Sequence, residues 1–492
     1  MSRSGNILKN IDWVTIAMFF ALTIFGWINI YSATYSFDES SIFDFSNRAG
    51  KQFVWIISAI IMGGLLLLID SKSFDLIAYV VYAVWLIVLL VTPFLARDIK
   101  GSRSWLTFGP LSLQPAEFAK CFTALAIAKY MSSYDWKPRR LIDFLVPILL
   151  IVFPMGIIMV LQKETGSALV FAAFFLMFYR EGMTEYILLI GAVAVTFFII
   201  VIKFGHPLVP LGMGDLGIAI CMLSLLIIEI FFLIFKLYER SQAGVFFRYS
   251  GLGLFGLTVF VTVVSFIVNI WVSVHFGIVY TTLVGISLLY LIFLGIRWRR
   301  KEIYILLMFI FFSMAYCYSC NYAFQNILKE HQRARIEQLL GLRDDPSGIG
   351  YNVNQAKIAI GSGGFCGKGY LKGTQTKLQF VPEQATDFIF CTVGEEWGFF
   401  TSSILLIVYA FFILRLIQLA ERQKDRFSRI YGYSIASIFF MHVVINIGMV
   451  IGILPVIGIP LPFFSYGGSS LWGFTIMLFI FLKLDASRFD KM

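Results

Sequence analysis

Charged residues are scarce in this sequence. Asp, Glu, Lys and Arg make up only 14% of its 492 residues, whereas 59% are hydrophobic. Soluble globular chains carry about 25% charged residues, and a soluble chain of this length could not cover so much apolar surface with ordinary cores. The low charge content therefore excludes a soluble protein.

Cysteine is also rare, and its placement does not suggest a disulfide framework. Most of the six cysteines lie in apolar segments, and Cys366 is the loop exception. Cys317 and Cys320 have the spacing of a redox pair. No soluble redox fold surrounds them, so we interpret them as small apolar residues of a helix. The chain also lacks a low-complexity tail, an obvious short repeat and a separate soluble domain.

Long apolar runs fill the sequence instead. A bilayer-spanning helix needs about 20 predominantly apolar residues, and several runs are apolar throughout, which excludes the alternating strands of an outer-membrane barrel. Fourteen segments qualify, near residues 12–32, 53–69, 74–95, 114–131, 141–161, 166–180, 185–204, 217–237, 251–272, 276–297, 303–325, 388–414, 430–452 and 466–484. The sequence predicts an all-α polytopic membrane protein with about fourteen transmembrane helices.

The net charge of +10 does not indicate nucleic-acid binding, because the basic residues sit in short loops beside spans. The positive-inside rule explains this pattern if both termini lie inside. The first span then stays in place as a helix and is not a cleaved signal. Basic residues remain on the unfavoured outer side at Arg97, Lys100 and Arg103 and in the long stretch 326–386.

One polar stretch, from about Gln325 to Thr386, interrupts the membrane pattern and is predicted to lie outside. Loops of this length are usually functional or disordered, and its Ile, Phe and Tyr content argues against disorder. Residues 329–340 read as an amphipathic helix. The glycine-rich part, 348–381, is expected to pack on the outer membrane edge as the lid or floor of a site.

The run 361–369 (GSGGFCGKG) superficially resembles a nucleotide-binding loop. Ser362 and Gly369 occupy the positions where a Walker motif needs Gly and Ser or Thr, so we exclude an ATPase. Its glycines fit backbone N–H groups that approach a ligand or simple tight turns, and both interpretations stay open.

Several ionisable residues mark a candidate site, each with a structural alternative. Thr386 and Asp387 fit an N-cap and first turn, but Glu383 adds a second carboxylate, and two carboxylates beside a basic, glycine-rich loop resemble an acid–base site. Glu117 and Lys120 share one helix face inside a span, where charges are functional or form internal ion pairs. Glu164 is similar, near the outer interface.

Further motifs also carry two interpretations. Trp105 fits an interfacial belt residue or a site residue. Glu395 and Glu396 lie two turns inside a span, and one of the two is expected to cap a helix or pair with a Lys or Arg. The proline-rich run 455–470 breaks any helix and must be buried in protein or line a cavity; its small residues 467–470 also suit close helix packing.

Together these motifs resemble the SEDS family (shape, elongation, division and sporulation proteins), most closely its RodA-type glycosyltransferases. The matching segments follow the family order: RSW at 103–105, QPAEFAK at 114–120, QKETGSAL at 162–169, QRARI at 332–336, residues 361–375, FVPEQATDFIF at 380–390, GEEWG at 394–398 and PFFSYGGSS at 462–470. Gln375, in a Gly-Thr-Gln triplet, looks like the elongation branch.

The chain departs from the family pattern in three ways. Ten spans are usual, so about four extra ones are expected. Residues 1–204 and 388–492 then form the N- and C-terminal core helices, 205–301 the inserted helices, and 302–387 a helix plus the long outer loop. Ala385 replaces a usual His, and Lys163–Glu164 a usual Pro-Asp. The insert has almost no ionisable residues within its spans, and we expect its Glu229 to bind a neighbouring helix or partner and not substrate.

The resemblance implies polymerisation of lipid II, an undecaprenyl-diphosphate-linked disaccharide-pentapeptide, into glycan strands at the outer face of the bacterial cytoplasmic membrane during elongation and shape maintenance. Asp387 would be the base, and cations would hold the leaving diphosphate. The substrate-binding residues implied are Arg103, Trp105, Glu117, Lys120, Glu164, Arg333, Lys368, Gln375, Glu383 and Ser465. The implied partner is a class B penicillin-binding protein, a single-span transpeptidase. No cofactor or resident metal is expected, and assistance by a divalent cation stays open.

Two other functions compete with this enzyme. A lipid II flippase needs a charged path open to both faces, to which Glu117, Lys120 and Glu164 could belong, but the richest motifs cluster outside. A non-catalytic scaffold for the wall-building complex is the third interpretation. Polymerisation of lipid II by purified protein in detergent discriminates between them.

Overall fold

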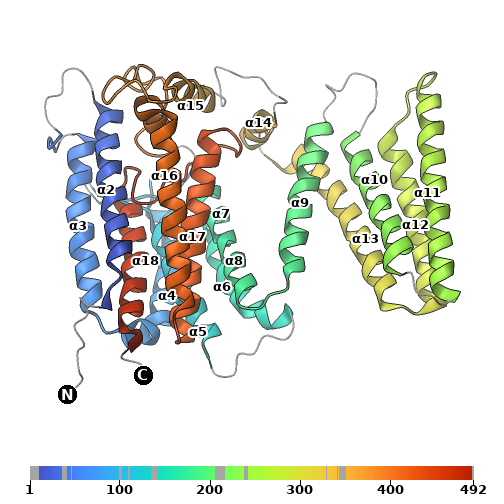
Figure 1. Ribbon diagram of the computed structural model, residues 1–492, viewed down its shortest axis with the longest axis horizontal. Helices are drawn as coiled ribbons and strands as arrows, with labels where there is room; N and C mark the ends of the chain where they lie inside the picture. Colours follow the sequence, from blue (N-terminus) through green and yellow to red (C-terminus); the bar gives the residue numbers. More distant parts are fainter. Residues whose placement is uncertain are drawn as a thin grey trace. The chain divides into compact units, whose positions relative to one another are not determined.

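The computed structural model describes residues 10–35, 42–45, 47–98, 102–108, 111–133, 141–205, 216–237, 242–328, 330–340, 342 and 351–489. The chain forms two compact units (Figure 1). Unit 1 combines Met1–Glu185 with Tyr351–Met492, and unit 2 comprises Tyr186–Gly350. Each unit is a bundle of helices, and the described strands form a single short hairpin in unit 1.

Unit 1 is built from two stretches of the chain. The N-terminal stretch contains α2 (Trp13–Thr34), α3 (Arg48–Leu68), α4 (Ser71–Leu95), β1 (Leu106–Phe108), β2 (Leu111–Leu113), α5 (Pro115–Met131), η1 (Leu141–Phe144), α6 (Leu145–Gly156), η2 (Ile157–Leu161), α7 (Thr165–Val170), η3 (Phe171–Ala173) and α8 (Phe174–Arg180). The C-terminal stretch contains α15 (Tyr351–Ser362), α16 (Ile389–Glu421), α17 (Arg426–Val450), α18 (Gly468–Ala486) and η6 (Ser487–Phe489).

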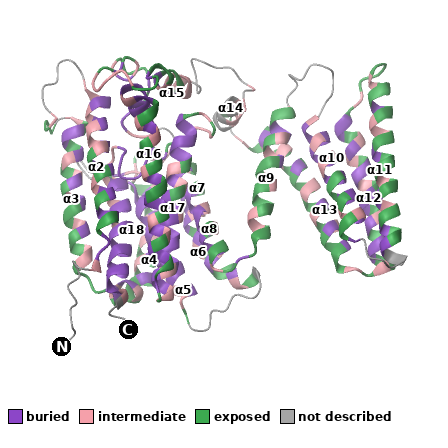
Figure 2. Ribbon diagram, viewed as in Figure 1, coloured by how far each residue is buried: buried purple, intermediate pink, exposed green. Residues whose placement is uncertain are grey.

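The core of unit 1 lies where α5, α17 and α18 meet. Most residues of these helices are buried, as the purple ribbon shows (Figure 2). On α5, small residues such as Ala116, Ala119 and Ala124 are almost fully buried, which lets neighbouring backbones approach as helix packing in membranes requires. This tightly packed centre places polar groups of α5 and α17 where no water reaches them.

Unit 2 is a helical bundle of its own. It contains α9 (Glu185–Phe204), α10 (Leu216–Phe231), η4 (Phe232–Lys236), α11 (Gln242–Asn269), α12 (Phe276–Trp298), α13 (Lys301–Tyr322), η5 (Ala323–Ile327) and α14 (Glu330–Leu339). The predicted role of Glu229 as a link to a neighbouring helix is confirmed, because its Oε2 on α10 accepts a hydrogen bond of 2.8 Å from Ser287 Oγ on α12.

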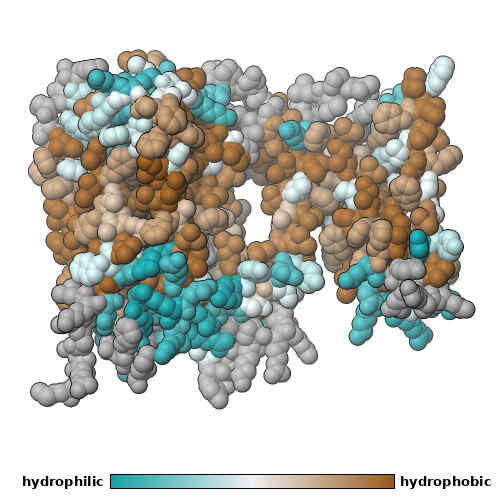
Figure 3. All heavy atoms as spheres, in the orientation of Figure 1, coloured by the Kyte–Doolittle hydropathy of each residue, from teal (hydrophilic) through white to brown (hydrophobic). Residues whose placement is uncertain are grey.

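The predicted all-α membrane fold is confirmed. All fourteen predicted segments are helical, and among the described residues twelve helices are long and apolar enough to cross a membrane. The other two, α5 with 17 residues and the apolar stretch Thr165–Arg180, are shorter, so the exact count of fourteen stays a prediction. Large apolar side chains such as Phe94 and Leu68 are 86% and 76% exposed, as lipid-facing residues are. Figure 3 shows hydrophobic residues over much of the visible surface.

The glycine-rich loop after α15 forms backbone hydrogen bonds with α16 in place of bonds within that helix. The N–H groups of Lys368 and Gly369 donate to the carbonyls of Glu395 and Glu396 at 3.0 and 2.9 Å. In an unbroken helix these carbonyls would accept from the residues four places on. The N–H groups of those residues, Phe399 and Phe400, donate instead to loop carbonyls at 2.9 and 3.1 Å. At this point the loop therefore replaces two hydrogen bonds of the helix with bonds between the loop and the helix.

Two glycines make these hydrogen bonds between the loop and α16 possible. Gly367 has φ +79° and Gly398 has φ +77°, a left-handed conformation that side chains disfavour. A Cβ on either glycine would meet the backbone of the other segment. The glycine run thus allows backbone-to-backbone approach, and the N–H groups of Lys368 and Gly369 are already used by α16.

Candidate functional site

The candidate base, Asp387, lies against a non-helical segment at one end of unit 1. Residues 455–461, between α17 and α18, have no regular secondary structure. Gly458 stands beside Asp387, because a Cβ added to this glycine would lie 3.2 Å from Asp387 Oδ2. The predicted break in the helix before the last span is confirmed. Because Gly458 has no side chain, space remains beside the Asp387 carboxylate.

Asn446 of α17 fastens the two segments together. Its Nδ2 donates to the carbonyl of Asp387 at 2.8 Å and to that of Ile459 at 2.6 Å. Ser465 closes the other side, with its hydroxyl donating to the Thr386 carbonyl at 2.6 Å. The backbone on both sides of the Asp387 side chain is therefore fixed by side chains that do not depend on that carboxylate.

The local structure around Asp387 differs from the prediction. Helix α16 begins at Ile389 with Phe388 as its N-cap residue, so the prediction that Thr386 caps it and Asp387 lies in its first turn was wrong. The N–H groups of Thr386 and Phe388 both donate to the Glu383 carbonyl at 3.2 Å. This turn, with Glu383 at φ +53°, delays the helix and presents Asp387 from a loop.

A fully buried network lies next to this segment. Lys120 on α5 donates 2.8 Å hydrogen bonds to Glu117 Oε1 and to His442 Nε2 on α17. Because a lysine ammonium only donates, His442 Nε2 accepts, which assigns the ring proton to Nδ1. Nδ1 then donates to the Pro460 carbonyl at 3.3 Å. The three side chains are at most 1% exposed, so this is the internal ion pair that the sequence suggested, extended by a histidine.

Glu164 is the centre of a second polar group, half-buried between η2 and α7. Gln114 Nε2 and Ser167 Oγ both donate to its Oε1, the latter at 2.7 Å. Burial raises the pKa of Glu164, and hydrogen bonds from Ser167 and Ser104 oppose the rise. Gly166, two residues later, packs against the Ile457 carbonyl, so this group also borders the non-helical segment.

Arg103 and Trp105 precede the hairpin close to Glu164. The N–H of Arg103 donates to the Gln162 carbonyl at 3.1 Å. Its guanidinium is 56% exposed and lies 3.7 Å from Asp98 Oδ2, a loose ion pair. Trp105 is half-buried. Among the predicted cationic site residues of unit 1, Arg103 has the side chain with the largest exposed fraction.

Lys368 and Gln375 converge on a carboxylate that the sequence left without a partner. Glu395 Oε1 accepts from Lys368 Nζ at 2.7 Å and from the N–H groups of Thr374 and Gln375 at 2.8 and 2.9 Å. Its Oε2 accepts from the N–H and hydroxyl of Thr376 at 2.9 and 2.8 Å. Glu395 is thus the point around which residues 368–376 fold, and the charge of Lys368 is matched here.

Glu396 holds a second loop lysine against α2. Its carboxylate accepts from the Ser32 hydroxyl and lies 3.3 Å from Lys377 Nζ, whose side chain is only 5% exposed. Burial lowers the pKa of Lys377, and the Glu396 carboxylate opposes this. The two adjacent glutamates therefore bind two different lysines of one loop.

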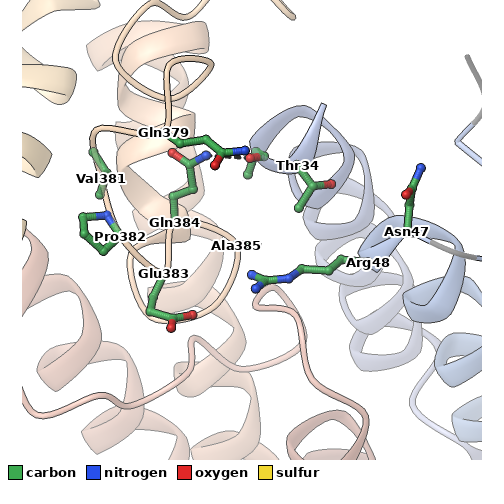
Figure 4. A pocket seen from close by; sticks show the side chains of 10 residues that line it. Thr34, Asn47, Arg48, Gln379, Val381, Pro382, Glu383, Gln384 and Ala385 are labelled. Atoms are coloured by element: carbon green, nitrogen blue, oxygen red, sulfur yellow. Dashed lines mark hydrogen bonds between the residues drawn. The ribbon is translucent and has the colours of Figure 1, made fainter. Parts of the chain in front are cut away.

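Glu383 lines a polar pocket of about 390 Å³ together with Arg48 (Figure 4). The pocket lies between residues 379–385 and the facing ends of α2 and α3. The remaining predicted residue, Arg333, belongs to unit 2. Its guanidinium donates to the carbonyls of Phe324 and Gln325 and lies over the Phe324 ring.

Unit 1 therefore brings two groups to one non-helical segment, residues 455–461. Asp387, with Ser465 and Glu383 bound to its turn, lies beside Gly458, and the Glu117–Lys120 pair reaches the Pro460 carbonyl through His442. The sequence analysis missed four polar residues of this region: Arg48, Lys377, His442 and Asn446. Three of them carried a signal. Arg48 is a basic residue on the predicted outer side, and His442 and Asn446 lie four apart in an apolar span, where polar side chains are expensive.

Comparisons with known proteins agree with this architecture. The family model described as cell cycle protein, for FtsW, RodA and SpoVE, matches residues 12–208 and 253–489. Peptidoglycan glycosyltransferase RodA of Treponema pallidum is 27% identical over 98% of this chain and 99% of its own length. Peptidoglycan glycosyltransferase MrdB of Escherichia coli is 43% identical over 38% of this chain, which is about half of that relative (49%).

Solved structures share the fold. One described as "Structural coordination of polymerization and crosslinking by a peptidoglycan synthase complex" matches with a TM-score of 0.57 and 22% identity, covering 97% of this chain and 98% of that one. Thermus thermophilus rod shape determining protein RodA matches with a TM-score of 0.50 and 20% identity over the same shares.

Proposed function

This chain belongs to the FtsW, RodA and SpoVE family, and from that premise we propose that it polymerises lipid II into glycan strands at the outer face of the cytoplasmic membrane. The chain is a peptidoglycan glycosyltransferase, as relatives that match it over nearly its whole length or at 43% identity are named. We assign it to cell elongation and shape maintenance.

The observation that carries the mechanism is the carboxylate of Asp387 beside Gly458, in a turn held by Asn446 and Ser465. A sugar hydroxyl must lose a proton as its oxygen attacks the anomeric carbon of the sugar diphosphate. A carboxylate within hydrogen-bond reach can accept that proton. The new glycosidic bond forms as the bond to the diphosphate breaks, which inverts the configuration at that carbon.

The leaving diphosphate requires positive charge. Lys120 is fully buried and already bound to Glu117 and His442, and Lys368 is matched by Glu395. Arg103 keeps an exposed guanidinium with only a loose partner. We therefore assign direct contact with the diphosphate to Arg103, since a guanidinium can bind phosphate oxygens in pairs. Lys120 holds Pro460 of the non-helical segment 455–461 in place through His442.

The flippase alternative receives less support. The groups proposed for a charged path are instead locked in place: the Glu117–Lys120–His442 network is buried between α5 and α17, and Glu164 is bound by Gln114 and Ser167. The relatives are also named as glycosyltransferases.

Polymerisation of labelled lipid II in detergent tests the proposal, because transport has no meaning without a closed membrane. We expect the purified protein, supplied with its partner transpeptidase, to produce glycan strands. Intact lipid II transport in liposomes without any strands in detergent would contradict the enzyme and favour the flippase.

A partner with crosslinking activity is part of the proposal. We propose a single-span class B penicillin-binding protein, because a structural neighbour is described as a complex that coordinates polymerisation and crosslinking. The chain is a multi-pass membrane protein. We further propose that both termini lie in the cytoplasm, which places residues 326–386 outside.

Thiol labelling tests this topology. Cys366 is exposed in the glycine-rich loop. Cys320 is half-buried within the apolar helix α13, and Cys121, Cys221, Cys317 and Cys391 are buried. A membrane-impermeant maleimide should label the parent protein in intact spheroplasts and should not label Cys366→Ser. Labelling that needs lysis would place the loop, and Asp387 with it, on the cytoplasmic side.

A further inference from the structure

The pocket beside the catalytic turn, the turn of residues 383–388 that holds Asp387, carries two opposite charges. Residues 379–385 form one wall, and the end of α2 with the start of α3 forms the other. Among its ten lining residues, Arg48 is the one cation and Glu383 the one anion. Figure 4 shows the Arg48 guanidinium extending toward the loop that holds Glu383. At about 390 Å³, the space is within the range of small-molecule sites.

Arg48 is held in position without a described carboxylate partner. Its guanidinium lies over the Tyr466 ring at 5.8 Å from the ring centre, and no described Asp or Glu lies within ion-pair distance of it. Arg48 also begins α3, whose N-cap residue Asn47 makes no side-chain capping bond. The partial positive charge of a helix N-terminus therefore adds to the guanidinium at this wall.

The pocket is rigidly connected to the catalytic turn. The Tyr466 N–H donates to the Ala385 carbonyl at 2.9 Å, two residues before Asp387. The Gln384 amide links the two walls, because it donates to the carbonyl of Ala33 on α2 at 2.6 Å and to that of Thr376 at 2.7 Å. A group bound here is thereby kept at a fixed offset from Asp387.

We infer that this pocket binds the peptide of lipid II, with a peptide carboxylate on Arg48. The inference rests on the proposed function and adds a subsite to it. Among the parts of lipid II, sugars carry neutral hydroxyls and need neither charge. A diphosphate would be repelled by Glu383. A peptide carboxylate supplies the negative charge that Arg48 requires and matches the fork of a guanidinium.

Such a subsite would hold substrate equally in the ground and transition states. Uniform binding of this kind lowers KM and leaves kcat unchanged. The peptide contact therefore aligns the sugar with Asp387 without taking part in proton transfer, which separates its signature from that of the base.

The experiment compares lipid II with the same lipid whose peptide carboxylates are converted to carboxamides, using the purified complex. For the parent protein, KM should be roughly tenfold higher with the carboxamide lipid, as expected for loss of one charge-assisted hydrogen bond. Arg48→Gln should raise KM for lipid II by a similar factor, with kcat unchanged, and the carboxamide should raise it no further.

Lys51→Gln is the matched control, since Lys51 is exposed on the same helix and does not line the pocket. It should behave as the parent does. Equal KM values of the parent for both lipids would overturn the inference without any variant, as would an Arg48→Gln penalty that is the same for both. Absence of glycan from the parent with either lipid would instead contradict the proposed function.

Discussion

Asp387→Asn is expected to abolish glycan synthesis, with a loss of kcat of about a thousandfold or more, within or above the range for removal of a general base. Asparagine keeps the size of the side chain beside Gly458 but cannot accept a proton at neutral pH. The fold should persist, because Asn446 and Ser465 bind the backbone carbonyls of Asp387 and Thr386 and not the carboxylate. Turnover of labelled lipid II by the purified complex measures the effect.

Asp75→Asn provides the matched control. Asp75 pairs with Lys129 on α5, and both side chains are partly exposed, so its loss should change stability little and leave turnover near that of the parent. Both variants should still copurify with the partner. Near-normal polymerisation by purified Asp387→Asn would remove Asp387 from the role of base.

The sequence was sufficient for the parts of the fold that depend on local composition. Apolar length alone located all fourteen helical segments, because a lipid-exposed backbone must satisfy its own hydrogen bonds within a helix. The spacing of Glu117 and Lys120 predicted their ion pair for the same local reason.

Contacts between distant segments could not be predicted in this way. Lys377 binds Ser32, 345 residues away, and Glu396 shares that site. The cap at Thr386 was mispredicted because a local rule for helix starts competes with a turn around the Glu383 carbonyl. Hydrogen bonding between the glycine loop and α16 likewise depends on which two backbones meet, and Gly-rich sequence alone fits several partners.

Arg48 and His442 illustrate the same limit at the site. Each is a single polar residue in an unfavourable place, which indicates function or pairing but not the partner. Only the fold places His442 on Lys120 and Pro460, and only the fold sets Arg48 opposite Glu383.

Glu395→Gln is expected to reduce polymerisation by at least about a hundredfold through the loop and not through the chemistry. The buried Glu395 carboxylate accepts from three backbone N–H groups and from Lys368. A glutamine amide would direct its own N–H groups at those donors and leave Lys368 uncompensated. Breaking one side of a buried pair typically destabilises by about 3–5 kcal/mol, enough to release residues 368–376 from α16.

Two measurements distinguish this loss from that of Asp387→Asn. Limited proteolysis should cut Glu395→Gln within residues 368–380 and should spare the parent and Asp387→Asn. Only Glu395→Gln loses the carboxylate that accepts the hydrogen bonds of the loop. Glu421→Gln, on the same helix, is the control: its carboxylate pairs with Arg180, and both side chains are more than half exposed, where such a pair contributes at most about 1 kcal/mol. A protease-resistant, active Glu395→Gln would mean that the backbone hydrogen bonds to α16 alone hold the loop, and that Lys368 can bind the diphosphate.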